Sequence, residues 1–135
     1  IDDIPERLRD CHLVIARSGA STVAELTAAG RPGLLVPLPH AIDDHQRFNA
    51  QQVEDAGGAW LMPQDRFSSE TVTDRLAKLL RNPAALTRAA KAAKTAGRAN
   101  AAERLADMVL DMLGLNPAGT PDAENISKKD QGDTQ

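Results

Sequence analysis

Short apolar runs alternate with amphipathic stretches along most of the chain. Three runs of mainly aliphatic residues are too short for a helix and lie between polar, Gly or Pro positions, a pattern typical of buried strands. These runs are residues 12–16, 33–38 and 59–62. Apolar residues at helical spacing predict helices around them. The predicted helices are residues 2–10, 18–29, 44–56, a stretch from 69, 83–96 and 99–113. This alternation predicts an α/β fold, a Rossmann-like parallel sheet with flanking helices.

Individual side chains also have predicted places in this fold. Gly30 ends the second predicted helix, and Asp43 or Asp44 caps the third. Phe48 on the third helix is expected to reach the core. The next helix carries a predicted core stripe of Val72, Leu76, Leu79 and Leu80. One face of the last helix collects Ala102, Leu105, Val109 and Met112.

Composition limits the class of protein. A length of 135 residues with 41% hydrophobic residues supports one domain. The net charge of −3 argues against non-specific nucleic-acid binding, which needs a basic surface. A single cysteine, Cys11, cannot form an internal disulfide, which favours a reducing compartment. Because Cys11 lies next to a predicted buried strand, we expect it to be a small core residue rather than a nucleophile. No run approaches the ~20 apolar residues of a membrane span.

The segment RSGAST, residues 17–22, is the first candidate site. It follows a predicted strand and opens a predicted helix, where ligands of open α/β sheets bind. Gly19 and Ala20 let backbone N–H groups approach a ligand closely, and Ser21 and Thr22 add hydroxyl donors. With the positive end of the helix dipole, these groups indicate an anion cradle for phosphate or diphosphate. The alternative is an ordinary Ser cap with a tight turn.

Three polar residues nearby suit a nucleotide sugar. Glu25 follows Thr22 by one helical turn, and a carboxylate there can accept hydrogen bonds from ribose hydroxyls. Gln46 and Asn49 share a helical face, where neutral amides suit sugar hydroxyls. Solvated side chains on exposed faces explain the same three residues without a ligand.

Two further clusters have simpler readings. His40, Asp43, Asp44 and His45 match no standard metal-ligand spacing, so no metal site is predicted there. Arg88, Lys91, Lys94 and Arg98 form a basic stripe that suits either a solvated helix face or anionic lipid.

Three stretches together resemble one family. They are DDIPERL (2–8), HLVIARSGASTVAEL (12–26) and AAGRPGLLVPLPHAIDDHQRFNAQQVEDAGGAWLM (28–62). They resemble the C-terminal domain of the MurG family, bacterial transferases that convert lipid I to lipid II with UDP-N-acetylglucosamine. The resemblance implies a two-domain GT-B architecture, of which this chain carries part of the C-terminal, donor-binding domain.

The resemblance also implies roles for single residues. The donor-binding positions are Arg17, Ser18, Gly19, Ala20, Ser21, Thr22, Val23, Ala24, Glu25, Gln46 and Asn49. In the family, the stretch from Ala20 to Glu25 lies near the diphosphate and ribose, with Glu25 on the ribose hydroxyls and Gln46 on the sugar. The implied reaction is an inverting transfer with no cofactor and no metal, and its catalytic residues are expected in an N-terminal domain.

Partners and location follow from the same resemblance. It implies UDP-N-acetylglucosamine as donor, lipid I as acceptor through the N-terminal domain, and no nucleic acid. It implies a peripheral protein at the cytoplasmic face of the bacterial inner membrane, serving peptidoglycan synthesis and thereby cell shape and division.

The chain begins without Met and inside a predicted helix. We therefore expect residues 1–113 to be the C-terminal UDP-sugar-binding domain, incomplete at its N-terminal side and inactive alone. Residues 114–135 have almost no apolar content, which predicts a disordered tail. Alternatives are the non-catalytic half of a split glycosyltransferase, another GT-B UDP-sugar enzyme, or a purely structural helix–sheet domain.

Overall fold

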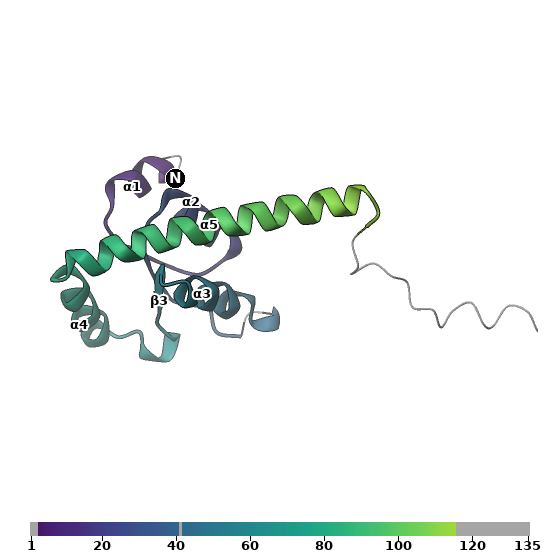
Figure 1. Cartoon of the computed structure of the whole chain (residues 1–135). Helices are drawn as coiled ribbons and strands as arrows, with labels where there is room; N and C mark the ends of the chain where they lie inside the picture. The colour runs from purple at the N-terminus through teal and green to yellow at the C-terminus, as the bar shows by residue number, and fades with distance from the viewer. Residues whose placement is uncertain (1–2, 41, 116–135) are drawn as a thin grey trace, which may run out of the picture. The chain divides into compact units, whose positions relative to one another are not determined.

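The computed structural model describes residues 3–40 and 42–115 (Figure 1). The helices and strands alternate as the hydrophobic pattern predicts. In chain order they are α1 (Ile4–Asp10), β1 (Val14–Ala16), α2 (Ala20–Ala29), β2 (Gly33–Leu35), η1 (Ile42–Asp44), α3 (His45–Asp55), β3 (Ala59–Leu61), η2 (Gln64–Arg66), α4 (Ser69–Leu80) and α5 (Pro83–Met112). By chain contacts they divide into two units, one ending at Ala102 and one beginning at Glu103.

The three strands form one parallel sheet in the order β1-β2-β3. Ile15 pairs with Leu34, and Leu34 pairs with Trp60. The ladder continues one residue past β2 and β3, through bonds from Val36 N to Ala16 O (2.9 Å) and Met62 N to Leu35 O (2.8 Å). The α/β prediction is confirmed, and the strands are shorter than the apolar runs that predict them.

Alternate residues of the sheet point into two separate cores. One core combines sheet residues with α2 and α3; its buried members are Val23, Leu26, Leu35, Ala50, Val53 and Ala59. The other core lies on the opposite face of the strands and includes Leu34, Val36 and Met62, with Trp60 and Val72 packed against it. Both faces of β2 are therefore buried, as parallel sheets require.

Helix α2 is bounded by two glycines. Gly19 takes the N-cap position without a side-chain cap. Gly30 ends the helix as predicted, in the left-handed conformation at φ 65°, which glycine adopts without a steric penalty.

Two predicted core side chains are exposed. Phe48 is 61% exposed because the inward face of α3 carries Ala50 and Val53. Leu80 is 59% exposed, whereas its neighbour Leu79 is buried, because adjacent helical positions differ by about 100°. Predicting Phe48 and Leu80 in the core is therefore wrong.

The start of α3 also departs from the predicted cap. Asp44 occupies the N-cap position but has left-handed backbone angles, and its side chain makes no cap hydrogen bond. His40 and Asp43 also have positive φ. The turn before α3 is therefore shaped by backbone geometry and not by an Asp side-chain cap.

The two helices predicted at 83–96 and 99–113 are one continuous helix, α5. Gly97 does not end it, because this glycine serves a close contact with α2: a Cβ built there would lie 2.9 Å from Thr27 C. The basic residues Arg88, Lys91, Lys94 and Arg98 are exposed on the part of α5 in the first unit. In the second unit, Leu105, Val109 and Met112 are exposed rather than packed in a core.

No described helix combines the length and apolar content needed to cross a membrane. Most of the tail predicted from residue 114 onward lies outside the described residues.

Candidate functional site

The N-terminus of α2 lies directly after β1, at the carboxyl edge of the sheet. The first backbone bond of the helix runs from Val23 N to Gly19 O (3.0 Å). The N–H groups of Ala20, Ser21 and Thr22 therefore lack helical acceptors. In the described part of the chain, the hydroxyls of Ser21 and Thr22 make no hydrogen bond. This end of the helix presents a set of donors and the positive end of a dipole, as an anion site requires.

Gly19 keeps this end of the helix open although the fold does not demand a glycine there. Its φ of −61° suits any residue, and a Cβ added at this position would meet nothing within 4 Å. The missing side chain leaves free space beside the N–H donors, so a ligand can approach the backbone closely.

Ser18 is fully buried and does not cap α2. Its Oγ donates to Gln46 O at 2.6 Å, and its carbonyl oxygen accepts from Asn49 Nδ2 at 3.1 Å. Both partners belong to α3, so Ser18 ties the loop after β1 to the start of that helix. The alternative of an ordinary Ser cap is therefore wrong.

Three further hydrogen bonds connect the loops at this edge. The Gln46 side chain accepts a hydrogen bond at Oε1 from Leu38 N, 2.9 Å away. Arg17 Nη1 donates to the carbonyl oxygens of Val36 and Pro37 at 3.3 and 3.4 Å. The loops after β1 and β2 and the start of α3 thus form one hydrogen-bonded assembly.

The remaining predicted residues lie along α2. Val23 packs its side chain into the core and its N–H is bonded to Gly19 O, and Ala24 is half-buried, so neither residue presents a polar side chain to a ligand. Glu25 is exposed and makes no hydrogen bond or ion pair within residues 3–40 and 42–115. Its carboxylate can therefore accept hydrogen bonds from a ligand near the helix end.

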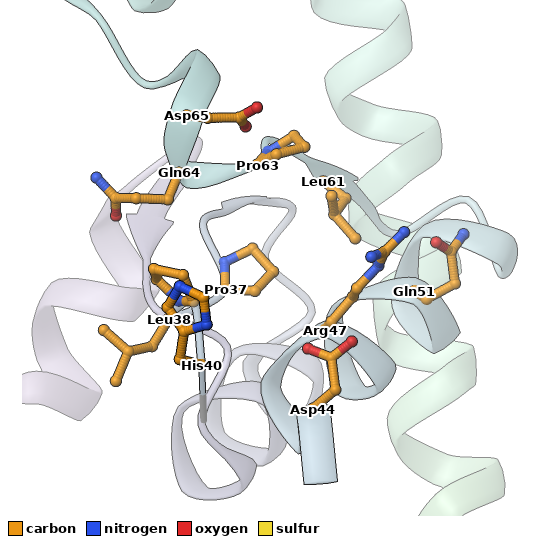
Figure 2. A pocket seen from close by; sticks show the side chains of 11 residues that line it. Pro37, Leu38, His40, Asp44, Arg47, Gln51, Leu61, Pro63, Gln64 and Asp65 are labelled. Carbon is orange, nitrogen blue, oxygen red and sulfur yellow. The ribbon is translucent and has the colours of Figure 1, made fainter. Parts of the chain in front are cut away.

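A cavity of about 420 Å³ lies at the carboxyl ends of β2 and β3 (Figure 2). Prolines and leucines form much of its wall, and Arg47 and Gln51 of α3 lie across from Gln64 and Asp65 of η2. Sequence reasoning identifies this edge of the sheet as a ligand-binding edge but does not single out these four residues. The sequence signal for Gln64 and Asp65 is that they lie in residues 62–68, which follow a predicted strand as residues 17–22 do.

The polar cluster before α3 does not gather metal ligands. His45 Nε2 lies 3.7 Å from Asp43 Oδ2, and both side chains are exposed. Among the residues that the structure describes, no three His, Cys, Asp or Glu side chains come together to hold a metal ion.

A parallel sheet with unpaired helix-end donors at its carboxyl edge is the architecture of the Rossmann-like class of α/β domains. Residues 1–105 match the glycosyltransferase family 28 C-terminal domain, and the chain belongs to this family. It is similar to proteins named UDP-N-acetylglucosamine--N-acetylmuramyl-(pentapeptide) pyrophosphoryl-undecaprenol N-acetylglucosamine transferase. The protein from Rhodospirillum centenum is 58% identical over 123 residues, 90% of this chain and 32% of that protein. The one from Paramagnetospirillum magneticum is 57% identical over 111 residues, 82% of this chain and 30% of that protein.

A solved structure supports the same assignment of the fold. The crystal structure of Acinetobacter baumannii MurG matches with a TM-score of 0.66 at 33% identity, over 84% of this chain and 31% of that one. The chain thus spans about a third of the length of its relatives. The predicted resemblance to a GT-B C-terminal domain is confirmed.

Proposed function

We propose that the chain is the donor-binding part of an enzyme that transfers N-acetylglucosamine from UDP-N-acetylglucosamine to lipid I. The observation that carries the proposal is the open end of α2, where unpaired N–H groups lie one helical turn from the free carboxylate of Glu25. The similarity to named transferases, at up to 58% identity over 123 residues, supports the choice of donor and acceptor.

In the proposed complex, the N–H groups of Ala20, Ser21 and Thr22 face the diphosphate. Glu25 accepts hydrogen bonds from the ribose hydroxyls, and Gln46 and Asn49 contact the sugar. When the acceptor hydroxyl attacks the anomeric carbon with inversion, negative charge grows on the departing UDP. Backbone donors fixed before the reaction stabilise that charge.

The proposal extends to the setting of the whole protein. The relatives' names contain undecaprenol, a lipid carrier, which supports a peripheral protein at the cytoplasmic face of the inner membrane. Its product would feed peptidoglycan synthesis, on which cell shape and division depend.

Calorimetric titration of the protein expressed from its complete coding sequence tests this function. Wild-type protein is expected to bind UDP and UDP-N-acetylglucosamine. Glu25→Ala is expected to weaken both ligands about tenfold or more, because hydrogen bonds to a charged acceptor are lost. Glu70→Ala, an exposed first-turn Glu of α4, is the matched control. Absence of binding, or equal effects of the two substitutions, would contradict the proposal.

A further inference from the structure

The part of α5 that belongs to the first unit concentrates positive charge. From Pro83 to Ala102 the sequence has two arginines, two lysines and no Asp or Glu, although the whole chain has a net charge of −3. The excess of acidic residues therefore lies elsewhere in the chain, and this part of α5 is positive by itself.

The packing of α5 directs three of these cations away from the domain. Ala93 is buried, and a Cβ built on Gly58 would lie 2.7 Å from Ala93 Cα, so this side of the helix faces the core. At about 100° per residue, Arg88, Lys91 and Arg98 lie about 140–160° around the helix from Ala93. All three are exposed. They form an outward row about 15 Å long, which we call the basic face of α5.

The fourth cation, Lys94, has a local role. A Cβ built on Gly30 would lie 3.0 Å from Lys94 Cδ, so the Lys94 side chain crosses the C-terminal end of α2, where the helix dipole favours a cation. The basic face has no such use. Within residues 3–40 and 42–115 its three side chains make no hydrogen bond and no ion pair. Its charges are available to an anionic partner.

We propose that the basic face of α5 binds the anionic phospholipid surface of a membrane. This inference rests on the proposed function, in which the acceptor is a membrane lipid. The other outward positions include Ala84, Thr87 and Thr95, which are exposed and short enough for a flat surface to approach the cations. No large apolar side chain on this face is present to insert into the bilayer, so the contact is electrostatic.

The size of the effect follows from the number of charges. Each Lys or Arg close to an anionic bilayer strengthens binding about fivefold, so three give about 100-fold. The attraction fades beyond a Debye length of about 8 Å at physiological salt, which requires α5 to lie at the membrane surface. Such binding would concentrate the donor-binding domain where its proposed acceptor is confined.

Vesicle sedimentation with the protein expressed from its complete coding sequence tests this surface. The vesicles consist of phosphatidylcholine alone or of equal parts of phosphatidylcholine and anionic phosphatidylglycerol. Arg88→Gln, Lys91→Gln and Arg98→Gln, combined in one variant, are expected to lower the partition coefficient on the anionic vesicles about 100-fold. Binding to the neutral vesicles should not change. Gln keeps most of the side-chain length and the helix propensity of Lys and Arg, so the variant should fold.

A matched control removes the same number of charges from exposed positions outside α5. It combines Arg66→Gln, Arg75→Gln and Lys78→Gln and is expected to keep most of the affinity for anionic vesicles. Thermal unfolding and UDP titration, which should be unchanged in both variants, show that each is folded.

The outcomes separate this inference from the proposed function. An unchanged partition coefficient in the α5 variant, an equal loss in the control, or a wild-type protein that binds RNA but not anionic vesicles would overturn the basic face as a membrane contact. The proposed function stands in each of these cases if the wild-type protein binds UDP and UDP-N-acetylglucosamine. If it binds neither nucleotide, the proposed function is wrong, and the vesicle result alone decides the basic face.

Discussion

At the residue scale, the sequence predicts part of the site that contains Ser18, Gln46 and Asn49. Their residue types and spacing predict a polar site at the carboxyl edge of the sheet. Their mutual bonds could not be predicted, because the partners are backbone atoms 28 and 31 residues away. Such contacts depend on where the loops after β1 and β2 meet, which residue type does not encode.

Gly19→Ala tests whether the open space beside α2 serves a ligand. Alanine fits the backbone and meets no neighbour. The free energy of unfolding should fall by less than about 1 kcal/mol, the small penalty of Ala at an N-cap. Affinity for UDP should fall by about tenfold, because the new methyl group occupies the approach to the N–H donors. Chemical denaturation and calorimetry measure the two effects, and unchanged UDP affinity would contradict this role.

At the scale of elements, the hydrophobic pattern predicts where the three described strands lie along the chain and that they are parallel. It is wrong about α5, where Gly97 reads as a break between two helices. A single sequence does not distinguish a glycine that permits close helix packing from a glycine that ends a helix. Only the approach of Thr27 to Gly97 distinguishes the two cases.

Gly97→Ala should therefore destabilise the first unit. In an exposed helix this change would stabilise by up to about 1 kcal/mol. Here the added Cβ would lie 2.9 Å from backbone and side-chain atoms of Thr27, so we expect a net loss of about 1–3 kcal/mol. Urea denaturation measures the loss. Thr95→Ala, at an exposed position of the same helix, should change stability by less than about 0.5 kcal/mol; a gain in Gly97→Ala would contradict the packing argument.

At the scale of the whole molecule, β1 and β3 are the two edges of the described sheet, and β1 is the more exposed of the two. Among the described strands it pairs only with β2, and Ile15 is 44% exposed on the sheet face that carries Leu34. Beside Ile15 lies a hollow of about 230 Å³ that also contacts Phe67. An unpaired edge next to apolar surface favours association with other chains.

The 135-residue chain expressed alone should consequently associate as its concentration rises. Ile15→Lys places a charge on this edge and should shift the chain toward monomer. Sedimentation at several concentrations gives the measurement, with Ile4→Lys, at another exposed isoleucine, as the control. A wild-type chain that stays monomeric at high concentration would contradict the expectation.

The bond between Leu38 N–H and the Gln46 side chain has a spectroscopic consequence. Amide hydrogen exchange at Leu38 requires this one side chain to move, because no sheet bond protects the proton. Leu61 N–H is bonded in the same way to Glu54 Oε1 near the other end of α3 and provides an internal reference. A ligand that locks Gln46 in place would slow exchange at Leu38 and leave Leu61 unchanged, so the Leu38 proton reports occupancy at the start of α3.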